Sequence, residues 1–312
     1  MRKVAVSGGA GFIGSHLAKE LARRGYQVII IDDLSTGRKE NLEELMGKPL
    51  TGEEVQFVQG SITDLPLLQK LFQGVDCVFH LAAIPSVPRS LENPLASHQV
   101  NITGTLNVLL AARDNEAKKV IYACSASVYG DTPTLPKTED MLPNPQSPYA
   151  VTKLCGEYYC RVFEQVYGLP TVCLRYFNVY GPRQDPDSEY AAVIPKFIRR
   201  ALDGNPPIIF DDGEQTRDFT HVRDAVKATI LAAETEAREV YNVGSGNRTT
   251  INELAKLILS LIGSHLEPIH QEPRSGDIRH SLADISKIKA LGYNPNYSLR
   301  EGLEETISYL LQ

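Results

Sequence analysis

The sequence predicts an α/β protein with two lobes, in which a doubly wound parallel sheet is joined to a smaller mixed α/β lobe near the C-terminus. Short apolar segments such as KVAVSGG, QVIIIDD and CVFHLAA alternate with amphipathic stretches through the first 180 residues. Nearly continuous apolar strands separated by helices are typical of a parallel sheet that helices cover on both faces. The length of 312 residues also suits two lobes, because a domain commonly has about 150 residues.

The strands and helices of the first lobe can be assigned in chain order. VQFVQG, KKVIYACS and TVCLRYFN are further predicted strands, and helices are expected over 14–24, 101–115 and 149–166. After about residue 180 the pattern loosens and contains more proline, glycine and charge. A helix-like stretch over 222–234 and the strand-like EVYNVG are expected to return to the first lobe. We therefore assign 1–180 and 221–244 to the first lobe, and 181–220 and 245–312 to the second.

Composition excludes several classes of protein. A net charge of −6 argues against a nucleic-acid partner, which usually requires a basic face. No apolar run reaches about 18 residues, so no membrane-spanning helix is expected. The opening MRKVAVSGG runs directly into a strand and leaves no room for a signal peptide. Five cysteines without CxxC spacing, and scattered histidines, indicate a reduced cytoplasmic protein without a metal site.

A glycine-rich turn joins the first strand to the first helix. Gly8, Gly11 and Gly14 would let the backbone turn sharply and approach a pyrophosphate, which the helix N-terminus attracts. The next strand ends in Asp32, where a carboxylate can accept hydrogen bonds from a ribose diol. Asp33 rather than arginine follows it, which favours NAD over NADP, although Arg38 leaves NADP open. These features predict a Rossmann-type NAD-binding lobe.

The segment SPYAVTK carries the strongest chemical signal. Ser147 can cap a helix and Pro148 suits its first turn, so Tyr149 and Lys153 are expected on one helical face. A tyrosine ordinarily ionises near pH 10 and is a poor base at neutral pH. A neighbouring ammonium and an oxidised nicotinamide ring both favour the phenolate, which makes general-base catalysis feasible.

The spacing GxxGxxG, with HLAA at 80–83 and YxxxK, resembles the extended branch of the short-chain dehydrogenase/reductase superfamily. The branch often has an aspartate where this chain has Ser61, so the contact near the adenine is expected either to be weaker or to come from the Ile62 backbone and Asp64. In the extended branch the residue matching Ser125 hydrogen-bonds the reacting sugar hydroxyl, which implies Ser125, Tyr149 and Lys153 as the catalytic residues. The resemblance implies the cofactor-binding residues Gly8, Gly11, Phe12, Ile13, Gly14, Asp32, Asp33, Ser35, Thr36, Gly37, Ser61, Ile62, Leu81, Ala82, Ala83, Asn101, Ser125, Tyr149, Lys153 and Phe177.

The two positions after Ser125 separate the reactions that this superfamily performs. Sugar-nucleotide 4,6-dehydratases have an Asp–Glu pair there, and decarboxylating relatives keep a glutamate at the second position. Ala126 and Ser127 provide no carboxyl group for acid–base chemistry. What remains is oxidation of a hydroxyl and reduction of the ketone, which is epimerase chemistry.

Motifs along nearly the whole chain resemble the NAD-dependent UDP-sugar 4-epimerases. These motifs are RYFNVYGPRQ, YAAVIPKFI, IIF, GEQTRDFTHVRD and EPRSGD. In that family two arginines grip the diphosphate, as two guanidinium groups with forked hydrogen bonds could do. The resemblance implies the substrate-binding residues Ser127, Tyr149, Asn178, Val193, Ile209, Phe210, Arg217, Arg274, Asp277 and Ser281.

The sugar is not decided by these motifs. A small residue at Ser281 leaves room for an N-acetyl group, so the expected substrates are UDP-GlcNAc/UDP-GalNAc and/or UDP-Glc/UDP-Gal. For UDP-glucuronate a cation would have to meet the carboxylate, and Arg183 and Arg89 are the candidates. A reductase acting on a nucleotide sugar and a cofactor-sensing binding protein remain as alternatives. The family usually dimerises through helices like 101–115 and 149–166, so a homodimer is expected.

Overall fold

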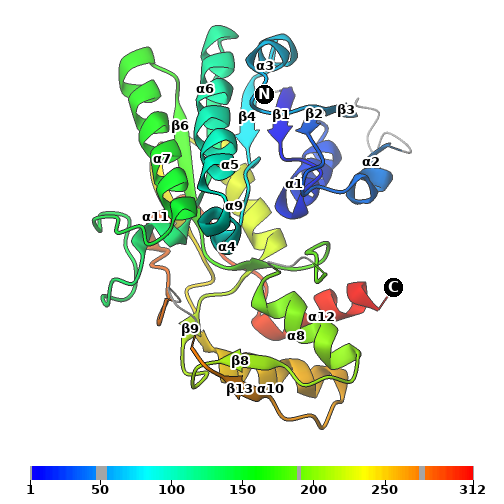
Figure 1. Cartoon of the computed structure of the whole chain (residues 1–312). Helices are drawn as coiled ribbons and strands as arrows, with labels where there is room; N and C mark the ends of the chain where they lie inside the picture. Colours follow the sequence, from blue (N-terminus) through cyan, green and yellow to red (C-terminus); the bar gives the residue numbers. More distant parts are fainter. Residues whose placement is uncertain (1, 47–54, 188–190, 274–277, 312) are drawn as a thin grey trace.

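A seven-stranded parallel sheet forms the centre of the first lobe in the computed structural model, which describes residues 2–46, 55–187, 191–273 and 278–311 (Figure 1). The strand order is β11-β6-β5-β4-β1-β2-β3, so the chain winds outward from β1 in both directions, which confirms the predicted doubly wound fold. The strands are β1 Lys3–Ser7, β2 Gln27–Asp32, β3 Val55–Gln59, β4 Cys77–His80, β5 Lys119–Ser125, β6 Thr171–Tyr176 and β11 Glu239–Val243.

Helices cover both faces of this sheet. One layer contains α3 (Leu65–Leu71), α6 (Gly104–Asp114) and α7 (Pro148–Tyr167), which lie side by side in front of the strands in Figure 1. The opposite layer pairs α1 (Phe12–Arg23) with α9 (Val222–Glu234), and α11 (Ser286–Lys289) packs against β11. Because both faces are covered, β2 and β4 are almost entirely buried, as their apolar sequences require.

The helix boundaries differ from the sequence expectation at two places. Helix α1 begins at Phe12, directly after the glycine turn. The helix expected over 101–115 begins with a π-helical stretch, Gln99–Thr103, before α6 continues to Asp114. A π-helical stretch inserts an extra residue into a helical turn and commonly marks a functional site. The short helices α4 (Val87–Glu92) and α5 (Pro94–His98) precede it.

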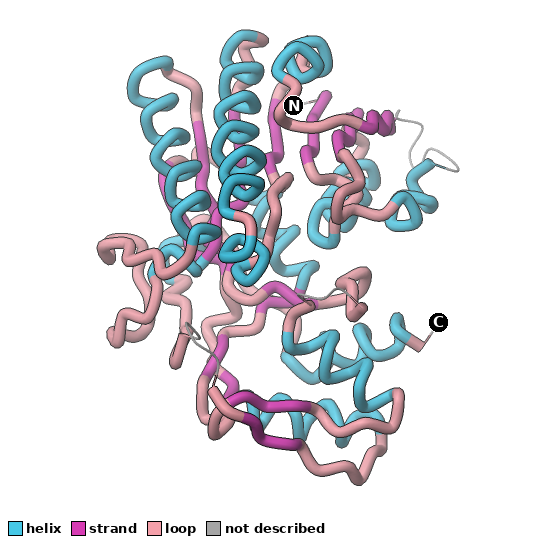
Figure 2. Tube along the Cα trace, in the orientation of Figure 1, coloured by secondary structure: helices cyan, strands magenta, loops and turns pink. Residues whose placement is uncertain are grey.

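A second apolar core lies below the sheet and is mostly helical (Figure 2). Its three longer helices are α8 (Val193–Leu202), α10 (Ile251–Ile262) and α12 (Leu299–Leu310), and β8 (Ile208–Phe210) pairs with β13 (Ile269–Gln271). Thr250 and Ser298 each form a capping box with a glutamate three residues later, which defines where α10 and α12 begin.

Short strand pairs connect this core to the first lobe. Strand β7 (Val179–Tyr180), which follows β6, pairs with β10 (Thr220–His221), and β9 (Thr216–Arg217) pairs with β12 (Thr249–Thr250). Helix α9 and strand β11 then re-enter the first lobe, where β11 pairs with β6. The chain therefore crosses between the lobes several times, and the crossing segments lie beside the carboxyl ends of the central strands.

Candidate active site

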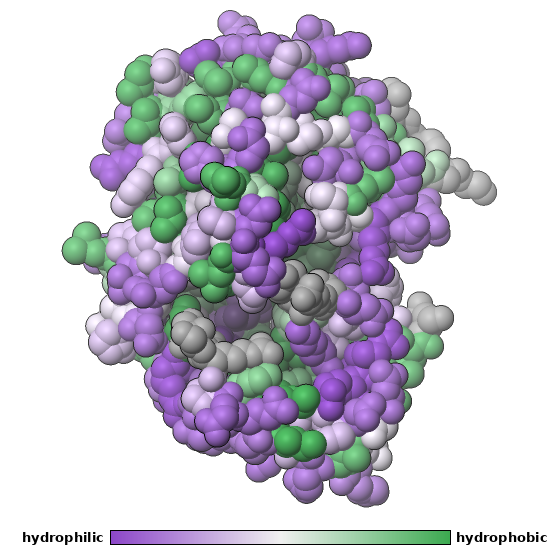
Figure 3. Space-filling view, in the orientation of Figure 1, coloured by the Kyte–Doolittle hydropathy of each residue, from purple (hydrophilic) through white to green (hydrophobic). Residues whose placement is uncertain are grey.

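A cavity of about 990 Å³ opens at the carboxyl ends of the central strands. The surface is hollowed between the two lobes in the space-filling view (Figure 3). In an open parallel α/β sheet, this edge is where ligands bind. The walls come from the turn after β1, the loop after β2, the segment after β4, the start of α7 and the segment before α8.

The glycine turn after β1 is so closely packed that side chains are excluded. Gly8 has φ +72°, and a Cβ there would lie 2.6 Å from the backbone nitrogen of Ala82. A Cβ on Gly14 would lie 2.1 Å from the carbonyl oxygen of Gly8, so α1 can approach β1 only with glycine at this position. Both glycines, with Gly11, line the cavity at the N-terminus of α1. This geometry suits a pyrophosphate.

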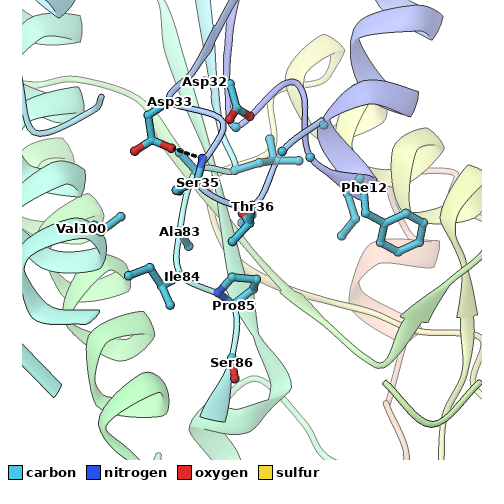
Figure 4. Close-up of a pocket in the computed structure, with 18 of the residues that line it drawn as sticks. Phe12, Asp32, Asp33, Ser35, Thr36, Ala83, Ile84, Pro85, Ser86 and Val100 are labelled. Carbon is cyan, nitrogen blue, oxygen red and sulfur yellow. Dashed lines mark hydrogen bonds between the residues drawn. The ribbon is translucent and has the colours of Figure 1, made fainter. Parts of the chain in front are cut away.

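Asp32 ends β2 at the wall of the same cavity. Its carboxylate accepts hydrogen bonds from the N–H groups of Ala10 and Leu34, both at 2.9 Å. Burial raises the pKa of Asp32, and these backbone hydrogen bonds oppose the rise. The next carboxylate, Asp33, accepts a hydrogen bond from the N–H of Ser35 at 2.9 Å (Figure 4). The loop is thus held in a shape in which Asp32 and Asp33 line the cavity, and one such carboxylate is enough to bind a ribose diol.

Most of the predicted cofactor-binding residues line this cavity, whereas Ser61, Asn101, Ser125 and Phe177 do not. Those that line it are Gly8, Gly11, Phe12, Ile13, Gly14, Asp32, Asp33, Ser35, Thr36, Gly37, Ile62, Leu81, Ala82, Ala83, Tyr149 and Lys153. Asn101 is buried in the π-helical stretch, where its side chain accepts a hydrogen bond from the N–H of Ile84 and donates one to Oγ1 of Thr152. Phe177 is fully buried against Tyr129, and Ser61 hydrogen-bonds Thr63. Asn101 therefore supports the cavity wall from behind.

Helix α7 presents Tyr149 and Lys153 to the reacting end of the cavity. Ser147 caps the helix by accepting a hydrogen bond from the N–H of Ala150 at 3.1 Å, and Pro148 occupies its first turn. The N–H of Tyr149 donates to Oγ of Ser90 at 3.0 Å, which ties α4 to this helix end. Lys153 is 4% exposed, and its ammonium donates to the carbonyl oxygen of Ala123 at 2.8 Å.

The ionisation of both side chains is set mainly by burial. Burial raises the pKa of Tyr149 to about 12, and a hydrogen bond with the Ser125 side chain acts in the opposite direction. Burial also lowers the pKa of Lys153 to about 8, so its amine still carries a proton at neutral pH. The protein alone therefore keeps Tyr149 as a neutral phenol. A nearby positive charge, such as an oxidised nicotinamide carries, would favour its phenolate.

Ser125, at the end of β5, lies next to residues that carry no acid. Its Oγ accepts a hydrogen bond from the N–H of Ser127 at 3.1 Å and starts the short turn Ala126–Tyr129. Oγ of Ser127 is buried and has no hydrogen-bond partner among the described residues. An unpaired buried hydroxyl is costly, so this group is suited to a hydroxyl or amide of a bound ligand.

Of the predicted substrate residues, Tyr149 lines the cavity and Ser127 lies in the turn after β5. The others that the structure describes do not line the cavity; they lie in the connections between the lobes and in the second lobe. Asn178 follows β6 with φ +31°, and its side-chain amide donates to the carbonyl oxygen of Asp218 at 3.1 Å. Arg217 ends β9, and the N–H of Ser281 donates to the carbonyl oxygen of the adjacent Thr216 at 3.0 Å. These bonds place Asn178, Arg217 and Ser281 in neighbouring segments. Arg274 and Asp277 lie outside the described residues.

Three further predicted substrate-binding residues lie in the second lobe. Val193 begins α8, and Ile209 and Phe210 end β8. Ile209 is fully buried in the second core, while Val193 and Phe210 are half-buried. Ile209 therefore presents no exposed surface to a ligand in this conformation.

Buried Asp218 organises the segments that carry these residues. Its carboxylate accepts hydrogen bonds from the N–H groups of Ser245, Gly246 and Ala283 and from the hydroxyl of Ser245. Burial raises the pKa of Asp218, and these hydrogen bonds oppose the rise. The carboxylate thus ties β9 and β10 to the loop after β11 and to the chain after Ser281.

The segment after β4 forms a cavity wall that extends beyond the cofactor-binding residues expected from the sequence, which end there at Ala83. Beyond Ala83 the wall continues through Ile84, Pro85, Ser86, Arg89, Glu92 and Asn93 (Figure 4). Ser86 and Asn93 cap α4 and α5, each followed by a proline within the first helical turn. A capping residue followed by a proline, shortly after the end of a strand, is the sequence signal that could have identified this wall.

The two cations considered for a sugar carboxylate lie in different places. Arg89 lines the cavity on α4. Arg183 has only 10% of its side chain exposed, and its guanidinium lies 3.6 Å from Glu44 outside the cavity wall. Among the described residues, no group of three or more His, Cys, Asp or Glu side chains could hold a metal ion. No helix in the described part of the chain is both long and apolar enough to cross a membrane.

Comparison with known proteins identifies the family. The model for the NAD-dependent epimerase/dehydratase family matches residues 4–244. The chain belongs to this family. It is 39% identical over 308 residues to a UDP-glucose 4-epimerase from Mycolicibacterium smegmatis, covering 97% of each chain.

Solved structures agree in fold along the whole chain. A UDP-N-acetylglucosamine 4-epimerase from Methanobrevibacter ruminantium, in complex with UDP-N-acetylmuramic acid, is 43% identical with a TM-score of 0.94, covering 99% of this chain and 98% of that one. A UDP-glucuronic acid 4-epimerase from Bacillus cereus, in complex with UDP-glucuronic acid and NAD, is 36% identical with a TM-score of 0.92, covering 99% of both chains. These relatives place the protein among NAD-dependent UDP-sugar 4-epimerases, and its cofactor is NAD.

Proposed function

We propose that the protein interconverts the C4 epimers of UDP-sugars, with UDP-GlcNAc/UDP-GalNAc and UDP-Glc/UDP-Gal as substrates. The observation that carries this proposal is the combination at the reacting end of the cavity. Tyr149, Lys153 and Ser125 can move a proton at a hydroxyl, whereas Ala126 and Ser127 provide no carboxylate for dehydration or decarboxylation. Oxidation and reduction at one carbon then remain as the supported reaction.

The residues around the cavity have distinct tasks in this reaction. The glycine turn would hold the pyrophosphate of NAD and Asp32 its adenosine ribose. Bound NAD supplies a reversible hydride acceptor at the sugar carbon. Tyr149 takes the proton of the C4 hydroxyl and later returns it, Ser125 hydrogen-bonds the C4 oxygen, and the Lys153 ammonium favours the phenolate electrostatically.

The substrate must be held firmly at its nucleotide and loosely at its sugar, because the 4-keto sugar has to present both faces. Arg217 and Arg274 would grip the diphosphate from the second lobe, with Asn178 beside it and Asp277 on the uridine ribose. Ser127 has a buried hydroxyl without a partner among the described residues, which suits a sugar hydroxyl. The half-buried Ser281 leaves room for a 2-acetamido group.

UDP-glucuronate is the second candidate substrate, and one observation favours it. Arg89 lines the cavity, where its guanidinium could meet a carboxylate on C5. The other cation considered, Arg183, lies outside the cavity wall beside Glu44. A glucuronate specificity would therefore depend on Arg89.

Proton NMR of the purified protein tests these alternatives. The protein is incubated, without added cofactor, with UDP-GlcNAc, UDP-Glc and UDP-glucuronate in separate samples. Formation of the C4 epimer from either of the first two supports the proposal and shows that NAD is retained. If turnover requires added NAD(P)H and a reduced sugar accumulates, the protein is a reductase. If no sugar nucleotide is turned over, the result favours the alternative of a cofactor-sensing binding protein.

A matched variant tests the role of Ser281. Ser281→Tyr should abolish turnover of UDP-GlcNAc while turnover of UDP-Glc continues, because the larger ring occupies the space of the acetamido group. Equal loss of both activities would show that the residue does not discriminate between sugars. Arg89→Ala is the corresponding variant for UDP-glucuronate.

We also propose that the protein is a cytoplasmic homodimer. Helix α7 exposes apolar side chains along one face: Val151 44%, Tyr158 50%, Val162 45% and Val166 66%. Leu91 and Leu95, on α4 and α5 beside this helix, are 61% and 80% exposed. A contiguous apolar surface of this kind is typical of a subunit interface. The five free cysteines suit a reducing compartment.

A further inference from the structure

Arg38 lies at the wall of the cofactor cavity and is paired with a carboxylate from a distant part of the chain. Its Nη2 donates a hydrogen bond of 2.6 Å to Oδ2 of Asp185, and the two residues are 147 positions apart. Both line the cavity, Arg38 from the loop after β2 and Asp185 from the segment between β7 and α8. The pair therefore joins two sides of the cavity near Asp32.

The segment that carries Asp185 is held in place by further contacts with the first lobe. Nε2 of His16, on α1, hydrogen-bonds the carbonyl oxygen of Pro182 at 2.9 Å, and Arg183 lies 3.6 Å from Glu44 on α2 (Glu43–Met46). Oδ1 of Asp185 also accepts a hydrogen bond from the N–H of Asp187 at 3.0 Å. One carboxylate oxygen thus belongs to a local turn while the other faces Arg38.

The charges at this end of the cavity bear directly on which dinucleotide can bind. NADP differs from NAD by a phosphate on the ribose diol, the group that Asp32 would bind. Among the described residues that line the cavity, the cations are Arg38, Arg89 and Lys153, and the last two lie on α4 and α7. Arg38 is therefore the cation positioned to receive a 2′-phosphate, as arginines do in NADP-binding folds.

We propose that Asp185 is a specificity-determining residue that excludes NADP by engaging Arg38. A 2′-phosphate would have to displace the Asp185 carboxylate from Arg38 and would then lie among the carboxylates of Asp32, Asp33 and Asp185. The diol of NAD carries no charge and does not disturb the pair. This inference concerns the cofactor and holds whichever UDP-sugar is the substrate.

The variant Asp185→Asn separates charge from local structure. The side-chain carbonyl of the asparagine can still accept the hydrogen bond from the N–H of Asp187, whereas the negative charge that faces Arg38 is lost. The full-length protein is expressed in one host, purified with its bound dinucleotide and denatured, and the released NAD and NADP are quantified by mass spectrometry. The NADP:NAD ratio should rise at least about tenfold over the wild type, since a freed guanidinium can bind the phosphate.

Two further variants identify the cause of any change. Arg38→Ala combined with Asp185→Asn should return the ratio close to that of the wild type, because the proposed phosphate-binding group is then missing. Asp187→Asn removes a charge two residues away, at a side chain that lies 3.7 Å from Arg199, and should leave the ratio unchanged. An unchanged ratio in Asp185→Asn, an equal rise in Asp187→Asn, or a rise that persists without Arg38 would each overturn the proposal.

Discussion

Tyr149 is subject to two opposing influences in the protein alone. Burial raises its pKa to about 12, while the hydrogen bond with Ser125 lowers it. The catalytic base that we propose is therefore largely a neutral phenol until a positive charge is bound beside it. Its backbone is fixed independently, because the N–H of Tyr149 donates to Ser90.

Removing the phenolic hydroxyl should affect the chemistry without affecting the fold. Tyr149→Phe is expected to lower kcat by about 10²- to 10⁴-fold, the usual contribution of a positioned acid–base group. Binding of UDP, measured by calorimetry, should stay close to that of the wild type, because the diphosphate contacts that we propose do not involve Tyr149. Near-normal turnover would refute the assignment of Tyr149 as the base.

Ser125 offers a test based on pH. The hydrogen bond from Ser125 lowers the pKa of Tyr149, so its removal in Ser125→Ala should raise that pKa. Since the phenolate is the active form, the rising limb of the kcat–pH profile should move to higher pH. Ser125→Thr keeps a hydroxyl and should retain a profile closer to that of the wild type. A reduced kcat with an unmoved limb would mean that Ser125 acts on the substrate alone.

At the scale of elements, α7 is held on the sheet by a buried ion pair. Nη2 of Arg175, on β6, lies 2.6 Å from Oε1 of Glu157 on α7, and the two side chains are 3% and 7% exposed. Gly156 allows the same close approach, because a Cβ there would lie 2.3 Å from the hydroxyl of Tyr122. The helix that presents Tyr149 and Lys153 is thus anchored one turn further along.

Breaking this pair should destabilise the protein markedly. Glu157→Gln leaves the Arg175 charge buried without its counter-ion, and we expect a loss of about 3 kcal/mol in the free energy of unfolding. Glu164→Gln, on the same helix, removes a pair with the half-exposed Arg238 and should cost less than about 1 kcal/mol. Urea unfolding of both variants measures the difference, and equal losses would contradict the anchoring role.

At the scale of the whole molecule, the cavity lies at the edge of the first apolar core, and the apolar face of α7 lies on the outside of the first lobe. The cavity uses the carboxyl ends of the strands, which leaves the helix layer of α6 and α7 available to another subunit (Figure 1). A bulky charge in that layer would then be tolerated in a monomer and excluded from a dimer.

Val162→Glu should convert the proposed dimer into a monomer. The side chain is 45% exposed in the single chain, so the fold should accept a carboxylate, whereas burying two of them at an interface is costly. Met46→Glu, at a 54% exposed position on α2 far from α7, is the control and should leave the association state unchanged. Sedimentation velocity distinguishes the outcomes, and a wild-type protein that sediments as a monomer would show the proposal to be wrong.

The sequence by itself determined the features that depend on neighbouring residues. Apolar strands alternating with helices predicted the doubly wound sheet, and the structure and relatives confirm it. The glycine spacing and Asp32 predicted NAD, which the family confirms. These signals are readable because a turn, a cap or a helical face extends over only a few positions.

Only the tertiary structure decided how distant segments meet. Arg38 raised the question of NADP, and no local pattern indicates its pairing with Asp185, 147 positions away, on which our proposed answer rests. The contact of Ser90 with Tyr149 and the position of Arg183 beside Glu44 are of the same kind. Such contacts depend on how remote segments of the chain pack against each other, and this packing leaves no periodic trace along the sequence.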